Sequence, residues 1–573
     1  MTTKSVENMD PTTKKNIHSW LDEDYDPKTK QTIRDWLQSD PEKLVDAFYT
    51  HLHFGTGGMR GLMGIGSNRM NVYTVRAATQ GLANYILKQP VPKELKNHRA
   101  MIGYDSRENS KLFAEEVAKV FAGNGIEAHL FQDLRPTPLV SFGVRLRGCT
   151  AGVMITASHN PPAYNGYKVS WNDGAQVLPP HDKGIMAEVE KVTSPSKVKS
   201  VPSLNNPLII IEGTEIDIAY LAAMTSLQLH PDENRRFGNK LKVIYSPFHG
   251  TGITLAPEAL HRWGFTDVEV VKEQATPDGR FPTVKLPNPE DPAAMELGMA
   301  QLKRDYGDIF LATDPDADRV GVAVLHQDKV HLLNGNQIAC LCLHHILEGL
   351  SKQNRLPPKG ACVKSITTTD LFKAIAKKYN VTCFEVLTGF KYVVEKIRQW
   401  ENNPADAYTY LFGAEESYGY LFGTFVRDKD AIISCALIAE VALQAKLEGK
   451  TLIDLLEKLY DQYGHYTEEL LSISYPETKE GKESMEKAML LLRTKLPTQF
   501  HGRKVLAVED YLKPAPNSTL PMSDVLIFRL ENDGKVIVRP SGTEPKIKVY
   551  AALTNATPQE LKDLLDSIRQ LLN

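Results

Sequence analysis

Three stretches of the chain repeat the same order of apolar and polar residues. Each begins with a short apolar run and continues through a polar loop, an amphipathic segment, a turn at Gly or Asn and a second apolar run. Two strands joined through one helix must run parallel, because the connection crosses the face of the sheet. The pattern therefore predicts three α/β domains of related topology, although βαβ units are too common for the repeat alone to establish duplication. The strand, helix and strand of the three units are expected at 100–103, 112–121 and 126–131, at 241–245, 257–263 and 268–271, and at 362–366, 371–379 and 381–387.

The two ends of the chain follow different patterns. Residues up to about 50 place apolar side chains among many charges, which predicts a helical extension packed on the first domain. Near the other end, 525–530, 535–538 and 547–553 read as antiparallel strands, with a closing helix at 558–572. The predicted fold class is α/β, with three related α/β mixed-sheet domains and a C-terminal α+β antiparallel-sheet domain around a central cleft.

A chain of 573 residues is long enough for about three to five domains. The segment 193–207 is rich in Ser, Pro, Lys and Asn and indicates a first linker, and further breaks are expected near 327–329 and around 460–466. We therefore expect four domains. Their predicted limits are 1–205, including the helical extension, 206–327, 328–458 and 459–573.

The composition excludes several classes of function. Apolar residues make up 42% of the chain and charged residues 24%, and the net charge of −3 lacks the positive excess that nucleic-acid binding needs. An anionic substrate must therefore be held by local cations. The chain has no run of about twenty apolar residues, its first residues are polar, and its cysteines lack paired metal-ligand spacing. We expect a cytoplasmic protein with reduced cysteines, without a nucleic-acid or membrane partner, and either monomeric or homodimeric.

The segment from Thr156 to Pro162 follows an apolar run at 152–155. A buried strand that ends in small and polar residues delivers a tight loop at its carboxyl end, where open α/β sheets place their chemistry. The loop carries Ser158 and His159, and Lys168 follows ten residues after the serine. Ser158 is the candidate nucleophile. The alternative is an ordinary turn, because Ser-His and Asn-Pro are common dipeptides.

Asp314, Asp316 and Asp318 alternate in a short segment between two apolar runs. In a tight loop each pair of carboxylates repels by about 1 kcal/mol in water and by about 4 kcal/mol near a protein surface. A bound cation removes that repulsion, and hard oxygen ligands favour Mg²⁺, which keeps positions free for a phosphate oxygen. Arg319 would point at the same phosphate. A solvated acidic turn is the alternative, although such turns seldom lie so close to buried strands.

Two weaker segments carry groups suited to anions and sugars. In the glycine-rich segment 54–61, closely spaced glycines let backbone amides approach an anion, and Arg60 adds a fork of donors. Glu415 and Ser417 follow an apolar run and can exchange hydrogen bonds with sugar hydroxyls, and Lys391 could reach the same place. The alternatives are a common glycine turn, a solvated face and an ordinary surface lysine.

The segment that leaves the predicted strand at 535–538 concentrates hydrogen-bond donors. A guanidinium group, two hydroxyls, backbone amides exposed by a glycine and an ammonium group make a complete cradle for phosphate. A plain turn is the alternative, but turns rarely carry so many donors. The candidate phosphate ligands are Arg539, Ser541, Gly542, Thr543 and Lys546.

Taken in order, these segments resemble the α-D-phosphohexomutase superfamily, and the resemblance covers nearly the whole chain. The strings Thr-Ala-Ser-His-Asn-Pro (156–161) and Asp-Pro-Asp-Ala-Asp-Arg (314–319) carry it together. The Glu-Glu-Ser-Tyr-Gly form of the third loop (415–419) is similar to the phosphoglucomutase branch. The extension and the string Gly-Thr-Gly-Gly-Met-Arg-Gly (55–61) resemble bacterial α-phosphoglucomutases close to the phosphopentomutases. Ala414 departs from the glycine that many members have before the glutamate.

The resemblance implies an isomerase that interconverts α-D-glucose 1-phosphate and D-glucose 6-phosphate through a glucose 1,6-bisphosphate intermediate. In that scheme Ser158 carries a phosphoryl group. One Mg²⁺ per chain is held by Asp314, Asp316 and Asp318 and by one oxygen of the phosphoserine. Lys168 matches the position of the general base, which requires its amine to be neutral near pH 7 and hence partly desolvated or close to other cations.

The remaining candidates follow from the same resemblance. Arg60 and Arg319 would stabilise the charge of the transferred phosphoryl group, and His159 would position the loop or assist proton movement. The cradle at 539–546 would hold the phosphate of the substrate, and Glu415 and Ser417 its sugar hydroxyls. Because phosphoserine in water would hydrolyse, the fourth domain is expected to close over the substrate.

Other functions stay open at this point. The sugar could be ribose or deoxyribose phosphate, as in a phosphopentomutase, or another hexose phosphate. A Mg²⁺-dependent phosphatase would share the acidic loop and the nucleophile but would release phosphate to water. A non-catalytic sugar-phosphate-binding protein would keep the fold, although the intact serine, aspartates and Lys168 argue against it.

Overall fold

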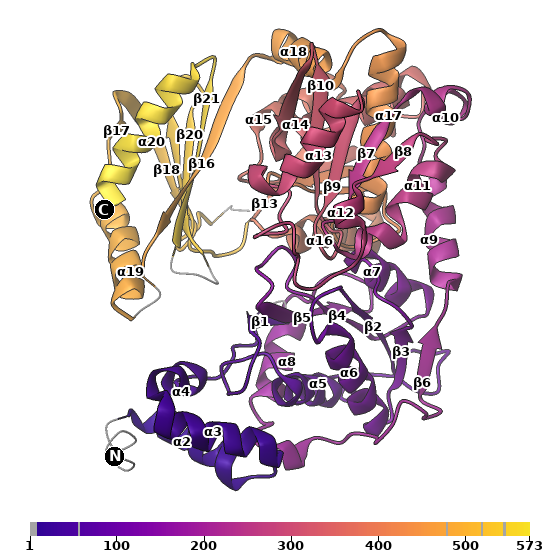
Figure 1. Cartoon of the computed structure of the whole chain (residues 1–573). Coiled ribbons are helices and arrows are strands. Elements are labelled where there is room, and N and C mark those ends of the chain that lie inside the picture. Colours follow the sequence, from indigo (N-terminus) through magenta and orange to yellow (C-terminus); the bar gives the residue numbers. More distant parts are fainter. Residues whose placement is uncertain (1–8, 56–57, 477–478, 517–519, 542–545, 573) are drawn as a thin grey trace.

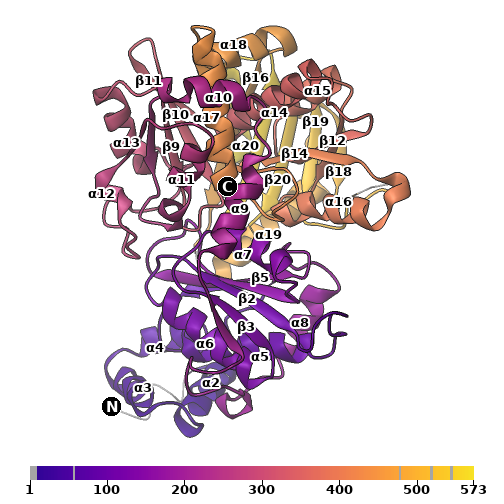
Figure 2. The ribbon, with the colours of Figure 1, turned by 90° about the vertical axis from the view of Figure 1, so that its right-hand side faces the viewer.

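The computed structural model describes residues 9–55, 58–476, 479–516, 520–541 and 546–572. These residues form four sheets, each built from a consecutive stretch of the chain. Figure 1 shows the first sheet and its helices at the bottom, the second and third above it, and the fourth at the upper left. In Figure 2 the second and third sheets lie next to each other above the first. The arrangement confirms the predicted class of three α/β domains followed by an antiparallel α+β domain.

The first sheet has six strands in the order β1-β5-β4-β2-β3-β6. Strands β2 and β3 run parallel and are joined through α6, as the first repeat predicts. The strands are β1 (Gly58–Leu62), β2 (Arg99–Tyr104), β3 (Glu127–Phe131), β4 (Ala151–Ile155), β5 (Tyr164–Trp171) and β6 (Ile209–Glu212). The helices are α5 (Val72–Ile86), α6 (Ser110–Gly123), α7 (Thr137–Leu146), α8 (His181–Val189) and the short η1 (Pro195–Lys197).

Part of the glycine-rich segment forms an edge strand, residues 58–62, which the sequence analysis did not predict. These residues are β1, which pairs antiparallel with β5 so that Gly58 lies opposite Lys168. Gly58 has a φ of 130°, and a Cβ there would lie 1.8 Å from the carbonyl oxygen of Tyr167. Only glycine allows this approach, and the strand then carries Arg60 along the edge of the sheet.

Three helices form the predicted N-terminal extension: α2 (Pro11–Asp22), α3 (Pro27–Ser39) and α4 (Pro41–Phe48). Each begins with an Asp-Pro pair. The aspartate side chain accepts hydrogen bonds from the first turn, and the proline has no amide that would need a partner. Apolar side chains of the three helices form a small core that also packs on Ile65 and Tyr73 of the first domain.

The second and third sheets contain the other two predicted repeats, and in each the repeated strands run parallel. The second sheet has the order β11-β10-β9-β7-β8 and the third the order β13-β12-β14-β15. The second domain contains α9 (Glu215–Thr225), α10 (Pro231–Phe237), η2 (Gly238–Lys240), β7 (Val243–Ser246), η3 (Thr251–Thr254), α11 (Ala256–Arg262), β8 (Val268–Val270), α12 (Lys272–Ala275), α13 (Pro292–Arg304), β9 (Ile309–Thr313), β10 (Val320–His326) and β11 (Lys329–Leu333). The third contains α14 (Gly335–Lys352), β12 (Gly360–Ser365), α15 (Asp370–Lys378), β13 (Thr382–Val386), α16 (Phe390–Asn402), η4 (Pro404–Asp406), β14 (Thr409–Glu415), β15 (Gly419–Phe422), α17 (Ala431–Leu447) and α18 (Leu452–Tyr463).

The fourth sheet has the order β16-β21-β20-β19-β18-β17, and all its pairs are antiparallel, as predicted. An ion pair of 3.1 Å between Lys535 and Asp370 and an apolar cluster that includes Ile366 and Ile537 join it to the third domain. Among the described residues, no helix combines the length and apolar character needed to cross a bilayer. The elements are β16 (Tyr466–Ser474), α19 (Lys479–Thr494), β17 (Gln499–Phe500), β18 (Arg503–Asp510), β19 (Leu526–Leu530), β20 (Lys535–Pro540), β21 (Lys546–Thr554) and α20 (Pro558–Leu572).

Secondary structure continues past each of the three predicted domain limits, which stay predictions. Strand β6, after residue 205, still pairs with β3 in the first sheet. The break expected after 327 is the turn of the β10–β11 hairpin, in which Gln327 and Asp328 both have positive φ. Helix α18 packs in the core of the third domain beyond residue 458, and the chain leaves it at Gly464, with a φ of 95°. Short runs of polar and turn-forming residues occur both at tight turns within a domain and at the limits between domains.

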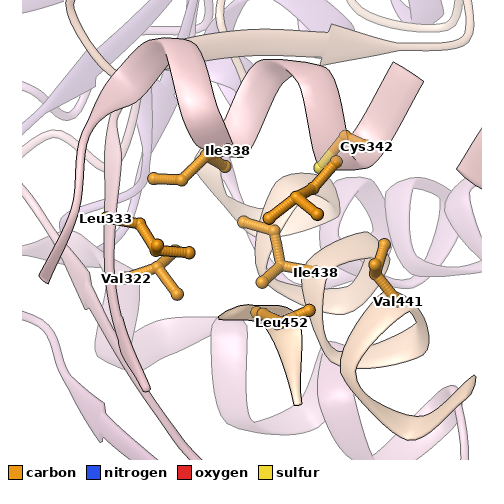
Figure 3. Close-up of a pocket in the computed structure, with 8 residues that line it drawn as sticks. Val322, Leu333, Ile338, Cys342, Ile438, Val441 and Leu452 are labelled. Carbon is orange, nitrogen blue, oxygen red and sulfur yellow. The ribbon is translucent and has the colours of Figure 1, made fainter. Parts of the chain in front are cut away.

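One apolar core runs through the second and third domains and extends to one face of the first, through side chains such as Leu139 and Val144 of α7. Helix α17 is buried along nearly its whole length and contacts both β9 and β10 of the second sheet and α14 and β15 of the third domain. A cavity of about 10 Å³ lies between the second sheet and helices α14, α17 and α18, lined by apolar side chains and Cys342 (Figure 3). It has room for at most about one water molecule. The two domains therefore share their packing and form a single unit.

Shortening a side chain beside this cavity should destabilise both domains together. Replacing Ile438, which is 2% exposed in α17, by alanine is expected to lower the free energy of unfolding by about 2–5 kcal/mol, because the enlarged void cannot collapse. The matched control is Ile218→Ala on α9, where the side chain is 56% exposed and the expected change is within about 0.5 kcal/mol. Urea unfolding measures both, and equal losses would contradict the shared core.

Candidate active site

The loop between β4 and β5 presents Ser158 to the acidic segment of the second domain. The Oγ of Ser158 donates a hydrogen bond of 2.9 Å to Oδ2 of Asp314 and lies 3.1 Å from Nδ1 of His159. Ser158 is buried and has a φ of 52°, a conformation that residues other than glycine rarely adopt. Burial and then the charges of Arg319 and Arg60 lower the pKa of His159 well below its usual value, so the imidazole beside the serine is neutral.

The three aspartates between β9 and β10 form one compact group. Asp314, Asp316 and Asp318 are all buried, and one carboxylate oxygen of each lies within 4.8 Å of the others. The amides of Asp318 and Arg319 donate to Oδ1 of Asp314, and Ala317, with a φ of 49°, turns the chain between them. Burial, followed by the charges of the other two aspartates, raises the pKa of Asp314 well above its usual value.

This group fits a hard divalent cation. Among the described residues, Oδ1 of Asp316 and Oδ1 of Asp318 have no hydrogen-bond partner, although both atoms are buried. Unpaired buried carboxylate oxygens are costly unless a cation binds them, and oxygen ligands are those that Mg²⁺ prefers. The three residues predicted as metal ligands therefore lie together, and Ser158, the fourth, contacts one of them.

Two lysines balance the charge of the aspartates. Nζ of Lys168, from β5, lies 2.6 Å from Asp316 and 3.1 Å from Asp318, and Nζ of Lys429 lies 3.0 Å from Asp318. Burial alone would lower the pKa of Lys168, but the two carboxylates outweigh it and raise that pKa. In this structure Lys168 is therefore an ammonium group paired with the two carboxylates. A general base would need a neutral amine at this position. Lys429 was not foreseen.

The two candidate arginines differ in their surroundings. Arg60 is exposed on β1, and its Nη1 donates a hydrogen bond of 2.6 Å to the Oδ1 of Asn160 in the serine loop. Arg319 is held by an ion pair with Glu290, and its Nε lies 3.9 Å from Asp318. Burial opposes the charge of Arg319, yet Glu290 and Asp318 raise its pKa. Arg319 thus remains charged beside the aspartates, and Glu290 is a partner that sequence reasoning missed.

The third loop lies at the end of β14. Burial and the charge of Glu416 raise the pKa of Glu415 to about 7, and Oε1 of Glu415 accepts a hydrogen bond of 2.6 Å from the amide of Gly389. The charges of Lys429 and Arg319, which also act on the aspartate group, oppose this rise in the pKa of Glu415. Ser417 lies in the turn between β14 and β15.

Lys391 reaches toward a different domain. It lies in the first turn of α16, where burial lowers its pKa and the charge of Asp182, on α8 of the first domain, opposes that shift. The predicted sugar-binding lysine is therefore close enough to the first domain to sense one of its carboxylates.

The phosphate cradle is only partly within the described residues. Arg539 is the next-to-last residue of β20, Ser541 follows the strand, and Lys546 begins β21. Gly542 and Thr543 lie outside the described residues. Among the described residues, Nε of Arg539 is buried without a hydrogen-bond partner, as expected for a donor meant for a ligand.

Lys548 adds a cation that sequence reasoning missed. It lies directly opposite Arg539 across β20 and β21. Burial and then the charge of Arg539 lower the pKa of Lys548, while the charges of Glu290, Glu416 and Arg319 also act on it. Arg539 and Lys548 of the fourth domain therefore lie within electrostatic reach of the loops that carry Arg319 and Glu416. The lysine was overlooked because it alternates within an ordinary strand pattern.

Comparisons with known proteins agree with this geometry. Four family models match consecutive parts of the chain: phosphoglucomutase/phosphomannomutase α/β/α domains I at 51–196, II at 219–327 and III at 334–463, and the C-terminal domain at 491–571. A phosphoglucomutase of Staphylococcus aureus is 36% identical over 520 residues, which cover 89% of this chain and 90% of the relative. One of Staphylococcus epidermidis is 35% identical over 529 residues, which cover 90% and 92%.

Solved structures share the fold at lower identity. A putative phosphomannomutase from Thermus thermophilus superposes with a TM-score of 0.69 at 21% identity, covering 91% of this chain and 99% of its own. The open form of parafusin, a phosphoglucomutase from Paramecium, superposes with a TM-score of 0.68 at 17% identity, covering 91% and 95%. Because all four domain models match in chain order over most of the sequence, the chain belongs to the phosphoglucomutase/phosphomannomutase family.

Proposed function

We propose that this chain is a phosphoglucomutase, an isomerase that interconverts α-D-glucose 1-phosphate and D-glucose 6-phosphate through glucose 1,6-bisphosphate. The observation that carries the proposal is the hydrogen bond between Ser158 and the buried aspartates, which holds a hydroxyl nucleophile against a site suited to a divalent cation. Relatives named phosphoglucomutase, matched over nine-tenths of their length, support the glucose substrate.

Ser158 would carry the phosphoryl group between the two sugar phosphates. Asp314, Asp316 and Asp318 would hold one Mg²⁺ together with an oxygen of the phosphorylated serine. When bound, Mg²⁺ neutralises charge on the transferred phosphoryl group. Arg319, kept charged by Glu290, adds a second positive charge near the same place, and neutral His159 can share a hydrogen bond with the serine.

Lys168 lies where the family's general base is expected. In the described structure its ammonium group binds Asp316 and Asp318 and so orients the two carboxylates. Its role as a base stays a prediction. Arg60 reaches the serine loop through Asn160, which suits a residue that steadies the phosphoryl group as it leaves the serine.

The substrate would be held at two ends. Arg539, Ser541, Gly542, Thr543 and Lys546 would bind its phosphate, while Glu415, Ser417 and Lys391 would bind sugar hydroxyls. Hydroxyl, amide and guanidinium donors can grip either the 1-phosphate or the 6-phosphate, which a mutase requires because the intermediate must turn over. Glucose 1,6-bisphosphate would then also activate enzyme that has lost its phosphoryl group. We further propose a cytoplasmic protein, monomeric or homodimeric.

The first test compares sugars and products. With Mg²⁺ and glucose 1,6-bisphosphate, kcat/KM should be higher for glucose 1-phosphate than for ribose 1-phosphate or mannose 1-phosphate. Ser158→Ala should lower turnover by at least on the order of 10³-fold, because the phosphoryl carrier is lost, whereas Ser226→Ala at an exposed position should not change it. A preference for ribose 1-phosphate would indicate a phosphopentomutase, and release of inorganic phosphate without isomerisation a phosphatase.

A second test concerns the metal. Chelation should abolish turnover, and Mg²⁺ should restore it. Asp316→Asn should weaken cation binding by about 100-fold, measured directly by calorimetric titration with Mg²⁺ or Mn²⁺. Asp305→Asn, in a half-buried residue that pairs with Arg304, is the matched control, with unchanged affinity. Equal affinity in wild type and Asp316→Asn would show that the aspartate group is not the metal site.

A third test uses the pKa of Glu415, which lies at about 7 in the free protein. A carboxyl with a raised pKa is protonated below that value and becomes a full hydrogen-bond acceptor above it. The groups that act on it are Glu416, Lys429, Arg319 and the amide of Gly389. The value of kcat/KM for glucose 1-phosphate should therefore rise as the pH passes upward through about 7.

Glu415→Gln should lower kcat/KM and remove this rise, because glutamine does not titrate. Glu448→Gln, in an exposed side chain at the end of α17, should leave the profile unchanged. A rise of the same size in Glu415→Gln would assign the titration to another group.

A further inference from the structure

One arginine outside the predicted set organises the loop that carries Ser158. Arg107 follows β2, and its side chain is fully buried. Its guanidinium group donates to four backbone carbonyls of that loop. Nη2 binds the oxygens of Ser158 and Asn160 at 2.6 and 2.5 Å, and Nη1 binds those of Pro161 and Tyr164 at 2.8 and 3.0 Å. A planar fork of donors can hold four diverging carbonyls, which a lysine ammonium cannot.

The same arginine is tied to the serine through a second route. Nε of Arg107 lies 3.3 Å from Oδ2 of Asp105, and that oxygen also accepts a hydrogen bond of 2.6 Å from the hydroxyl of Thr156. The hydroxyl of Thr156 in turn accepts a hydrogen bond of 2.8 Å from the amide of Ser158. The positive φ of Ser158 is therefore held from both sides, through its amide and its carbonyl.

A segment of the second domain covers Arg107. The ring centre of Phe281 lies 5.0 Å from the guanidinium carbon, a cation–π contact across the domain boundary. Beside it, a Cβ at Gly279 would lie 2.7 Å from the Cα of Arg107, so only glycine lets the two backbones come this close. The covering segment therefore touches the arginine through both a side chain and the backbone.

The covering segment is also connected to the aspartate loop. The carbonyl of His249 accepts from the amide of Asp278, and the two ring nitrogens of His249 lie 3.0 and 2.9 Å from the carbonyl oxygen of Thr276 and the hydroxyl of Thr283. Two residues after His249, the amide and the hydroxyl of Thr251 both donate to the carbonyl oxygen of Pro315, at 2.8 and 2.9 Å. Pro315 lies between two of the aspartates.

We infer that Arg107 and Phe281 are positioning residues that set the distance between Ser158 and the aspartate group. The chain of contacts begins at the serine loop, passes through Arg107 to the covering segment at 276–283, and ends through His249 and Thr251 at Pro315. Neither residue touches the reacting atoms. Because Ser158 and Asp314 belong to different domains, this bridge fixes a geometry that neither domain fixes alone. The inference rests on the proposed function, since its effect is read as a rate of phosphoryl transfer.

The test uses two pairs of matched substitutions. Arg107→Lys keeps the charge but loses the fork, and we expect kcat to fall by about 100-fold, as for a displacement of about 1 Å at the nucleophile. KM for glucose 1-phosphate and the affinity for Mg²⁺ should each change by less than about 2-fold, because those groups lie elsewhere. Arg280→Lys, in the same segment but exposed and paired with Asp278, should match wild type in every parameter.

Phe281→Leu should lower kcat by about 10-fold with the same unchanged KM, because the ring on Arg107 is lost. Its control is Phe265→Leu, an equally buried position of the second domain, which should cost similar thermal stability and leave kcat within about 2-fold. If Arg107→Lys does not fold, the comparison of Phe281→Leu with Phe265→Leu decides whether the inference holds.

The outcomes separate cleanly. A folded Arg107→Lys with wild-type kcat, or equal losses of kcat in Phe281→Leu and Phe265→Leu, would overturn the inference while the proposed function stands. A wild-type protein without mutase turnover on any of the three sugar phosphates would overturn the proposed function and this inference with it.

Discussion

The structure depends on one electrostatic constraint, the burial of three carboxylates within 4.8 Å of one another. Buried like charges are tolerated only when opposite charges and hydrogen bonds surround them. Here the compensating groups come from three domains: Lys168 and the Ser158 hydroxyl from the first, Arg319 from the second, and Lys429 from the third. The negative charge of the aspartates is therefore compensated only when the three domains are assembled. The contacts that hold these domains together are the same contacts that form the candidate active site.

The domains contribute unequally to this assembly. The second and third share an apolar core around α17. The first meets them through apolar side chains of α7, such as Leu139 and Val144, and through polar contacts such as the hydrogen bond from Thr137 to Asp316. The fourth rests on the third through Lys535 and a small apolar cluster, and offers Arg539 and Lys548 to the common region. The nucleophile is held by three domains that pack together, whereas the phosphate cradle lies on a separate sheet. This arrangement suits a reaction in which the intermediate must leave the cradle, turn over and bind there again.

Sequence patterns predicted the parts of the site that follow buried strands. Ser158 and the aspartates could be found because short apolar runs end in unusual clusters of polar residues, and the three repeats gave the order of strands and helices. The turn at Gln327 and Asp328 has the polar character of a linker, although it closes a hairpin, so polar residues alone do not fix a domain limit. The strand in the glycine-rich segment was not predicted, because glycines that allow a close contact between strands look the same in sequence as glycines that let amides approach an anion.

The residues that were missed are single polar side chains whose partners lie far along the chain. Arg107, Glu290 and Lys429 lie in loops and Lys548 in a strand, each near other charged residues. Nothing in the neighbouring residues distinguishes them from solvated charges. Their roles appear only when Ser158, Asp318 and Arg319 are brought together in space. The charge state of Lys168 has the same origin, because it is set by carboxylates nearly 150 residues away.

The central claim is that the serine loop and the aspartate group form one centre. Phosphorus NMR of the phosphorylated enzyme tests it most directly. If the claim is right, one equivalent of the paramagnetic ion Mn²⁺ should broaden the phosphoserine resonance beyond detection, and Mg²⁺ should compete this effect away. A phosphoserine resonance that stays sharp with Mn²⁺ bound would show that the metal site and the serine are separate, and would contradict the account.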